Sequence, residues 1–329
     1  MQKPKYVLGI ESTCDETGAA VVQNGKIILS NIIASSADIH RKYGGVFPEL
    51  ACRRHIEAII PVVDEALQTA GVSPDQIDLI AVAKGPGLIG ALLIGMNAAK
   101  GLSIAWKKPL IGVNHVEAHL YASMMDVERV PLPALGLVLS GGHTLMLKIL
   151  EIGAYEPIGT TVDDAIGEAF DKVGNLLGLP YPGGPEVEKL ARLGNPKAFP
   201  LSAGKVKRSP LNFSFSGLKT AVLYAMKGNV DKAGIAASFQ ETALRDVAHK
   251  ALLASQTFDC QSIILGGGVT ANQRLKEIMK ETFPHLPIFW PPGTLSLDNA
   301  AMIAGLGAHK FTGLSDPLDL EAKTRILIV

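Results

Sequence analysis

Two histidines stand four residues apart in the segment His115-Val116-Glu117-Ala118-His119. Residues at i and i+4 share one face of a helix, so both imidazoles could bind a single metal ion. Two packed or solvent-exposed histidines are the alternative interpretation. The order differs from the HExxH motif of zinc proteases, because Glu117 comes two positions after His115 instead of directly after it. The segment is therefore compatible with a metal site and disfavours a peptidase.

Several turns rich in glycine or hydroxyls could bind an anion. Ser140-Gly141-Gly142 and Gly266-Gly267-Gly268 each follow an apolar stretch, and Asn272 comes shortly after the second turn. No side chain covers the backbone N–H groups of such turns, so they can bind phosphate. Residues 11–17 add hydroxyls and carboxylates. No GxxxxGK[ST] loop is present, and we do not interpret any glycine-rich stretch as the GxGxxG turn of a dinucleotide-binding βαβ unit. This favours an actin-like nucleotide cleft, with purely structural turns as the alternative.

The elements that must position these residues recur in the same order in two halves of the chain. The patterns predict strands over 6–10, 18–22 and 27–33, and again over 135–139 and 145–150. Further strands precede helices, with predicted ranges 78–83, 109–113, 262–265 and 287–290. We interpret this order as an internal duplication, with a chance recurrence of common α/β parts as the alternative. Residues 163–177 and 235–253 are predicted helices within a mainly helical segment over about 160–250.

The predicted fold class is therefore α/β, a duplicated actin-like ATPase fold with two lobes around a nucleotide cleft. We expect residues 1–130 plus 298–329 to form the first lobe and 131–297 the second, with the helical segment as an insertion. Asp298 opens the helix that corresponds to the one after His115, so we expect it to face both histidines across the cleft. Two imidazoles and one carboxylate leave positions open for water or phosphate, which suits iron(II) and is compatible with zinc or manganese.

Composition narrows the class of protein further. The 329 residues suffice for two domains, and 47% apolar with only 19% charged residues argue against disorder. Lys+Arg and Asp+Glu are both 31, so nucleic-acid binding requires a local basic region or a partner protein. Three distant cysteines fit a reducing compartment. The uncharged stretch 85–99 is too short and glycine-rich to span a bilayer and predicts a buried helix. We expect a soluble cytoplasmic protein without a membrane partner.

Motifs along nearly the whole chain resemble those of one family, in the same order. They occupy residues 9–17, 43–49, 85–93, 115–119, 140–144, 167–172, 181–185, 212–220, 268–272 and 298–303. They resemble the TsaD family, the tRNA N6-adenosine threonylcarbamoyltransferases formerly described as O-sialoglycoprotein endopeptidases. The bacterial-type branch fits best, because Val138 and Leu139 stand in the strand where the archaeal and eukaryotic branch carries a metal-reaching tyrosine.

The resemblance implies roles for particular residues. The family has the actin/sugar-kinase/Hsp70 fold, and His115, His119 and Asp298 resemble its ligands for one divalent metal, iron(II) or else zinc. Asp15 and Glu16 resemble acidic residues near the reacting group. The residues that resemble contacts to the adenylate substrate are Val138, Leu139, Ser140, Gly141, Gly142, Asp171, Gly184, Glu188 and Asn272.

The function implied is transfer of threonylcarbamoyl from threonylcarbamoyl-AMP to N6 of the adenosine next to the anticodon in tRNAs that read ANN codons. The resemblance also implies TsaB and the ATPase TsaE as partners. Candidate basic residues for tRNA are Arg41, Lys42, Arg53, Arg54, Lys205, Lys207 and Arg208, with plain solvated charges as the alternative. Open alternatives for the protein are a small-molecule kinase or ATP-driven binding protein of the same fold, a metalloprotease, and a catalytically silent scaffold.

Overall fold

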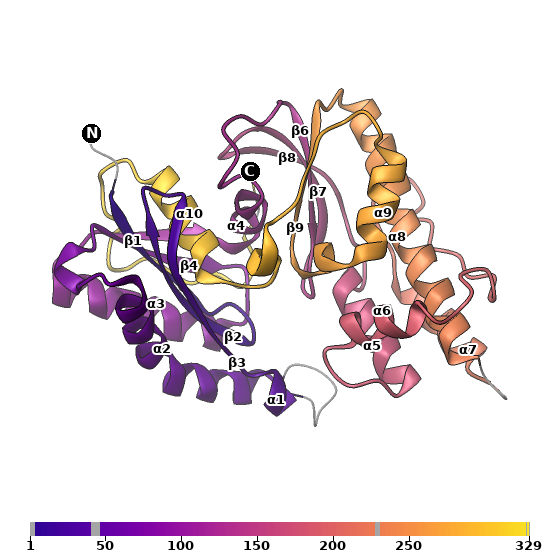
Figure 1. The fold of residues 1–329 in the computed structure, drawn as a ribbon, viewed down its shortest axis with the longest axis horizontal. Coiled ribbons are helices and arrows are strands. Elements are labelled where there is room, and N and C mark those ends of the chain that lie inside the picture. The colour runs from indigo at the N-terminus through magenta and orange to yellow at the C-terminus, as the bar shows by residue number, and fades with distance from the viewer. Residues whose placement is uncertain (1–3, 41–46, 228–230, 327, 329) are drawn as a thin grey trace. The chain divides into compact units, whose positions relative to one another are not determined.

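The computed structural model describes residues 4–40, 47–227, 231–326 and 328, which form two compact units. Of the described residues, unit 1 holds those up to His40, 47–128 and those from Pro291 onward, and unit 2 holds the rest of Arg129–Trp290. Arg41 and Lys42, and most of the motif at 43–49, lie outside the described residues. Figure 1 labels most of the helices and strands of each unit.

Unit 1 is built on a five-stranded mixed sheet of order β3-β2-β1-β4-β5 (Figure 1). The antiparallel part is a meander, and Asn24 and Gly25 join β2 to β3 with φ values of 53° and 71°. This left-handed pair is typical of a tight hairpin turn, which confirms the predicted hairpin. β4 and β5 extend the sheet in parallel. The strands are β1 (Tyr6–Glu11), β2 (Glu16–Gln23), β3 (Ile27–Ser35), β4 (Leu79–Gly85) and β5 (Leu110–Asn114).

Helices cover both faces of this sheet. Leu8 and Ile10 of β1 pack into one apolar cluster with residues of α2 and α3, whereas Gly9 between them faces α10. Successive strand residues point to opposite faces, so α10 lies on the face opposite to α2 and α3. The helices are α1 (Ala37–His40), α2 (Pro48–Ala70), η2 (Pro74–Gln76), α3 (Ile89–Trp106), α4 (His115–Ala122), η4 (Gly293–Ser296) and α10 (Ala300–Lys310).

Helix α3 differs from the expected buried helix. Only one of its faces is buried, and Ile89, Leu93 and Ile104 on the other are between 46% and 61% exposed. With 18 residues, this helix is long and apolar enough to cross a membrane, and no other helix among the described residues meets that criterion. The core helix of a globular protein can meet it as well. The expected burial was wrong for the exposed face, because the sequence does not show which faces of a helix other elements cover.

Unit 2 repeats the sheet of unit 1. Its strand order β10-β9-β6-β7-β8 matches β5-β4-β1-β2-β3, with an antiparallel meander followed by parallel strands. The predicted duplication is therefore confirmed at the level of topology. The strands are β6 (Ala134–Leu139), β7 (Thr144–Glu151), β8 (Ala154–Thr160), β9 (Ser262–Gly266) and β10 (Ile288–Phe289).

The helices of unit 2 enclose a second apolar core. They are α5 (Ile166–Leu177), α6 (Gly183–Ala191), α7 (Ser216–Ala225), α8 (Lys232–Thr257), η3 (Gly268–Ala271) and α9 (Gln273–Thr282). Asp163 does not begin α5 as expected. Its carboxylate instead accepts hydrogen bonds from the Ser214 hydroxyl at 2.6 Å and the Phe215 amide at 2.8 Å. These bonds to a distant segment hold the turn before α7.

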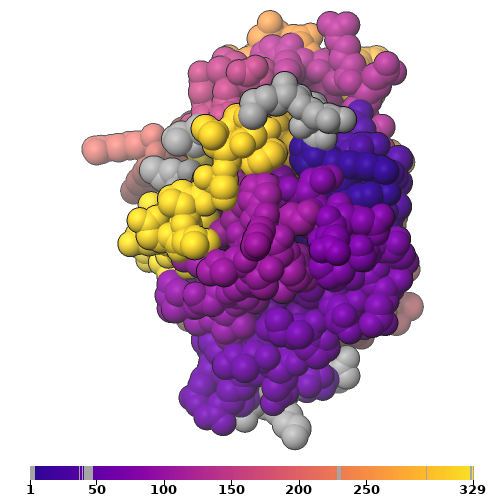
Figure 2. All heavy atoms as spheres, turned by 90° about the vertical axis from the view of Figure 1, so that its left-hand side faces the viewer, coloured from indigo at the N-terminus to yellow at the C-terminus, as the bar shows by residue number. Residues whose placement is uncertain are grey.

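The C-terminal segment, yellow in Figure 2, lies along the edge of the unit 1 sheet. The Asp316 amide donates to the Leu110 carbonyl at 2.7 Å, and the Asp316 carboxylate accepts from the Gly112 amide at 2.8 Å. The Lys323 amide donates to the Lys84 carbonyl at 2.8 Å. The first two contacts satisfy backbone groups that the edge strand β5 would otherwise expose, and the third satisfies a carbonyl near the end of β4. Cys14, Cys52 and Cys260 are free thiols.

Candidate metal centre and nucleotide-binding residues

The two histidines of the paired motif are placed by a capped helix start. β5 ends at Asn114, whose side chain accepts hydrogen bonds from the amides of Val116 and Glu117 at 2.9 and 3.2 Å. This N-cap starts α4 directly at His115. His115 and His119 are buried, and their ring centroids are 4.6 Å apart. The predicted shared helix face is therefore present.

Asp298 reaches the same point from the start of α10. Asn299 caps that helix by accepting from the Met302 amide at 3.1 Å, which fixes the chain direction at Asp298. α10 packs so closely on β1 that a Cβ at Gly9 would collide with the Ala300 carbonyl oxygen. As a result, Asp298 Oδ1 lies 3.1 Å from His119 Nε2.

All three residues belong to unit 1. The expectation that Asp298 faces the histidines from across an interlobe cleft was therefore wrong. Helices α4 and α10 pack against each other within one unit, which brings the ligand set together locally. Asp298 Oδ1 also lies 3.6 Å from His115 Nε2.

The chemistry of this cluster fits a metal ion. Neither ring nitrogen of the fully buried His119 has a hydrogen-bond partner among the described residues, although its Nε2 is close to Asp298. Buried polar atoms without a partner are rare in folded proteins, since each costs about 1–3 kcal/mol. One ligand atom from each of His115, His119 and Asp298 lies within 4.8 Å of the others. A divalent ion would satisfy these atoms, and the donor set does not fix which ion.

A fourth residue, Glu11, supports the cluster. Its Oε2 lies 2.9 Å from His115 Nδ1, and its Oε1 accepts from the Thr13 amide at 2.7 Å. Burial alone lowers the pKa of His115, but the charges of Glu11 and Asp298 together with the Glu11 hydrogen bond raise it to about 9. The site is therefore strongly attractive to positive charge. Sequence reasoning placed Glu11 in a polar turn but not in the metal site, since nothing in the motif shows which atom it contacts.

Asp15 and Glu16, the two acidic residues expected near the reacting group, lie where the turn after β1 ends. Glu16 opens β2, and its Oε1 accepts from the Ser35 hydroxyl at 2.8 Å. Its buried Oε2 has no hydrogen-bond partner in the part of the chain that the structure describes. Burial and then the charge of Asp15 raise the pKa of Glu16 to about 7, with Asp298 adding to the effect. Burial followed by Asp298 also raises the pKa of Asp15. The charge of Asp298 thus contributes to the raised pKa of both carboxyls.

In unit 2, the turn Ser140-Gly141-Gly142 presents free backbone donors. The Ser140 amide donates to the His143 carbonyl at 2.8 Å, and the His143 amide donates to the Ser140 hydroxyl at 3.1 Å. Within the described residues, the amides of Gly141 and Gly142 have no hydrogen-bond partner, and both residues are exposed. A Cβ at either position would meet no atom within 4 Å. The folded chain does not itself require glycine there, whereas a close ligand would.

The other expected nucleotide contacts of unit 2 are linked by hydrogen bonds between helices. Asp171 of α5 accepts from the Gly183 amide at 2.8 Å, just before Gly184. Glu188 of α6 accepts from the Gln273 amide at 3.1 Å. Asn272 caps α9 and donates to the Gln240 side chain at 2.9 Å. The Leu139 carbonyl packs against Gly267, and Val138 is buried beside it. These bonds connect Asp171, Glu188 and Asn272 through α5, α6 and the start of α9.

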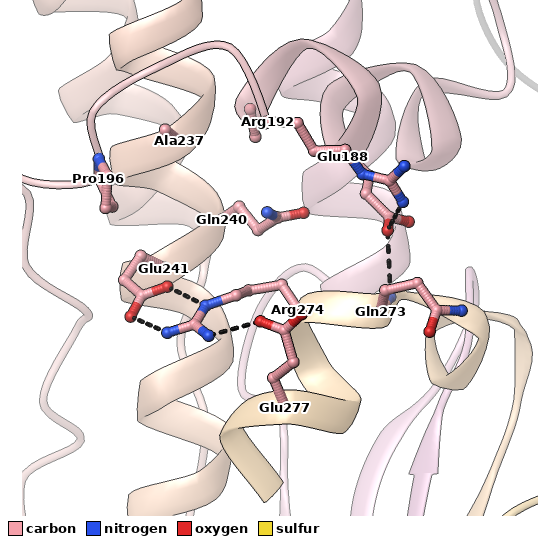
Figure 3. A pocket seen from close by; sticks show the side chains of 10 residues that line it. Glu188, Arg192, Pro196, Ala237, Gln240, Glu241, Gln273, Arg274 and Glu277 are labelled. Carbon is pink, nitrogen blue, oxygen red and sulfur yellow. Dashed lines mark hydrogen bonds and ion pairs between the residues drawn. The ribbon is translucent and has the colours of Figure 1, made fainter. Parts of the chain in front are cut away.

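A polar pocket of about 150 Å³ lies between α6, α8 and α9 of unit 2 (Figure 3). Glu188 and Gln240 point into it, and the Arg274 guanidinium binds both oxygens of Glu241 at 2.7 and 2.9 Å. This ion pair holds α9 against α8 on one side of the pocket. Sequence reasoning missed Gln240 and Arg274, which belong to no motif and become visible only through their contacts.

The fold and the site define an actin-like α/β protein with a His–His–carboxylate centre. Its structure resembles full-length HypF in the phosphate- and nucleotide-bound form, with a TM-score of 0.64 and 15% identity over 96% of this chain and 48% of that one. It also resembles (R)-2-hydroxyglutaryl-CoA dehydratase component A of Acidaminococcus fermentans, with a TM-score of 0.53 and 15% identity over 93% and 99% of the two chains. These likenesses confirm the fold class alone.

Sequence comparison identifies the family. Residues 27–305 match the model of TsaD, tRNA N6-adenosine threonylcarbamoyltransferase. The chain is 57% identical to the Protochlamydia amoebophila protein of that name over 97% of both chains. It is 47% identical to the Bacillus subtilis protein over 98% of this chain and 95% of that one. The chain belongs to the TsaD family, as the motifs predict.

Proposed function

We propose that the protein transfers the threonylcarbamoyl group from threonylcarbamoyl-AMP to N6 of the adenosine next to the anticodon in tRNAs that read ANN codons. The observation that carries the proposal is the combination of 57% identity to a threonylcarbamoyltransferase over 97% of the chain with a buried His–His–Asp cluster. In the reaction, N6 forms a bond to the carbamoyl carbon, the bond from that carbon to the phosphate oxygen breaks, AMP leaves, and N6 loses a proton.

His115, His119 and Asp298 would hold one divalent metal ion, iron(II) by family resemblance, with zinc as the alternative. Two imidazoles and one carboxylate suit both ions and leave coordination positions open. When bound, such an ion supplies a Lewis acid that stabilises negative charge on a carbonyl or phosphate oxygen.

Glu16 is the residue best suited to accept the proton from N6. An aromatic amine is a poor nucleophile, so the proton must leave as the C–N bond forms. A pKa of about 7 leaves a large fraction of Glu16 ionised at neutral pH while keeping it basic enough to take a proton. Its buried Oε2, for which the described residues provide no hydrogen-bond partner, is the acceptor atom. Asp15 would share in orienting the amine.

The unit 2 residues would bind the adenylate. The free amides of Gly141 and Gly142 supply fixed donors for phosphate, which need no rearrangement during the reaction. Asp171 and Glu188 offer acceptors suited to ribose hydroxyls. Asn272 and Gly184 lie where the backbone of α9 and α6 begins, which suits contacts with sugar or base.

Two surfaces suit the macromolecular partners. Isoleucines and a leucine of α2 and α3 form an exposed apolar face, which we call the α2/α3 face, made of Ile56, Ile60, Ile89, Leu93 and Ile104. Apolar surface of this kind marks protein–protein contacts, and we assign it to TsaB. TsaE would act with that complex.

Lys205, Lys207 and Arg208 are exposed and form no ion pair within the described residues, which suits contacts with tRNA phosphates in the cytoplasm.

Reconstitution tests this function directly. Purified protein is incubated with unmodified tRNA, TsaB, TsaE, and a synthase that makes the donor from threonine, bicarbonate and ATP. The tRNA is then digested and analysed for threonylcarbamoyladenosine by mass spectrometry. We expect product with the wild type and at least a 100-fold loss with H115A/H119A, as for removal of a main electrostatic stabiliser. Undiminished product with H115A/H119A would contradict the proposed metal role, and no product with the wild type would contradict the function. Phosphate transfer to a small acceptor would favour the kinase alternative.

A further inference from the structure

We propose that Glu11 is a positioning residue for the metal centre, whose carboxylate fixes the orientation and tautomer of the His115 imidazole. The proposal rests on the proposed function in one respect, namely that His115, His119 and Asp298 bind a metal ion. It assigns to Glu11 no contact with the ion or with the substrate.

The contacts of Glu11 are those of a fixed support. It is the last residue of β1 and pairs with Gly18 of β2, so its backbone is held by the sheet. Its side chain is 0% exposed, and its two oxygens have different donors. Oε1 accepts from the Thr13 amide at 2.7 Å, and Oε2 lies 2.9 Å from His115 Nδ1. With Oε1 held by the Thr13 amide, the carboxylate has little freedom to turn away from the imidazole.

This arrangement decides which nitrogen of His115 can bind an ion. An ionised carboxylate only accepts hydrogen bonds, so Nδ1 of His115 must carry the proton. When an ion displaces the second proton of the ring, the lone pair is therefore on Nε2, the nitrogen that lies 3.6 Å from Asp298 Oδ1. A carboxylate behind a metal-binding histidine also makes the ligand more basic. His119 has no such support, because neither of its nitrogens has a hydrogen-bond partner among the described residues. Among the described residues, a hydrogen bond therefore fixes the tautomer of His115 but not that of His119.

A purely structural role for Glu11 is the competing explanation. The bond to the Thr13 amide alone would stabilise the turn between β1 and β2, and Thr13 Oγ1 also lies 3.3 Å from His115 Nδ1. A structural role would change the melting temperature of the protein but not the metal affinity of the folded molecule. Metal affinity and thermal stability therefore separate the two explanations.

The test measures metal binding by the full-length protein, without substrate or partners. Co²⁺ is titrated by visible absorption, which reports ligand geometry, and Zn²⁺ by calorimetry. The variant is Glu11→Gln, which has a single acceptor oxygen and so cannot serve both the Thr13 amide and His115. We expect metal affinity about 10–100-fold below the wild type, with an altered Co²⁺ spectrum and unchanged stoichiometry.

Glu117→Gln is the matched control. Glu117 is also a buried carboxylate and lies on α4 between the two histidines, but its oxygens bind Lys310 Nζ at 2.8 and 3.1 Å. We expect its metal affinity to stay within about twofold of the wild type, well below the effect of losing a supporting carboxylate.

The outcomes are distinct. Equal affinity of Glu11→Gln and the wild type overturns the role of Glu11 and leaves the metal centre intact. Absence of metal binding by the wild type overturns the metal centre, and the role of Glu11 with it. If Glu11→Gln does not fold, Glu11→Asp is measured instead, because it keeps the charge but is one methylene too short to hold both donors. A wild-type affinity in Glu11→Asp would also overturn the proposal.

Discussion

His119 Nε2 lies 3.1 Å from Asp298 Oδ1, yet the two atoms do not form a hydrogen bond. Two residues from distant parts of the chain thus present electron-pair donors to the same point. Replacement of Asp298 by Asn keeps the shape but removes the charge that attracts a cation. We expect at least a tenfold loss of Zn²⁺ affinity and a comparable loss of transfer activity. Calorimetry on D298N measures the affinity, and binding equal to that of the wild type would exclude Asp298 as a ligand.

Glu16→Gln tests the proposed base. Removal of a general base lowers rates by about 100- to 10,000-fold, so kcat of reconstituted transfer should fall in that range. Activity of the wild type should rise as the pH increases through about 7, because ionised Glu16 is the active form. The variant should lack this limb. If the activity of E16Q rises over the same pH range as that of the wild type, the ionisation belongs to another group.

The same substitution has a predicted effect on stability. A carboxyl whose pKa is raised in the folded state to about 7 from 4.5 stabilises the fold most at low pH, and this contribution is lost as the pH rises through both values. At pH 5 the folded protein holds Glu16 protonated, much like glutamine, whereas at pH 8 it holds a buried charge. The melting temperature of E16Q relative to the wild type should therefore be higher at pH 8 than at pH 5. Equal differences at both values would contradict the raised pKa.

Two glycines in unit 2 form a matched pair for the proposed phosphate contact. A Cβ at Gly141 would meet nothing within 4 Å, whereas one at Gly167 would stand 2.7 Å from the Ser140 carbonyl oxygen. We expect G141A to keep its stability within about 0.5 kcal/mol and to bind AMP at least tenfold more weakly. G167A should lose about 1–3 kcal/mol of unfolding free energy through overpacking. Chemical denaturation and AMP titration give both quantities, and wild-type AMP affinity in G141A would place the phosphate elsewhere.

The α2/α3 face predicts a binding defect without a folding defect. Ile60 is 56% exposed, so Ile60→Glu should change the free energy of unfolding by less than about 0.5 kcal/mol. It should weaken TsaB binding by at least tenfold, because a charge would be buried in an apolar contact. Leu193→Glu in unit 2, at a residue 81% exposed, is the control and should bind TsaB normally. Surface plasmon resonance measures both, and normal binding by Ile60→Glu would locate the TsaB contact on another surface.

Much of the fold followed from local patterns in the sequence. Alternating and continuous apolar stretches gave the two hairpins, and Asn24-Gly25 gave the first turn, because these features depend on neighbours in the chain. The start of α5 was misplaced, since Asp163 forms its bonds with Ser214 and Phe215, some fifty positions away. No local rule distinguishes a helix cap from a carboxylate that bonds to a remote turn.

For the site, the sequence by itself determined the chemistry of the ligands: the i,i+4 spacing put His115 and His119 on one helix face. Only the tertiary structure decided that Asp298 approaches them within unit 1, because that depends on α10 packing closely over Gly9. It also decided the contact between Glu11 and His115, which requires β1 and β5 to end on the same side of one sheet. The type of each side chain is given by the sequence at its own position, whereas the distance between two side chains is set by how the elements pack.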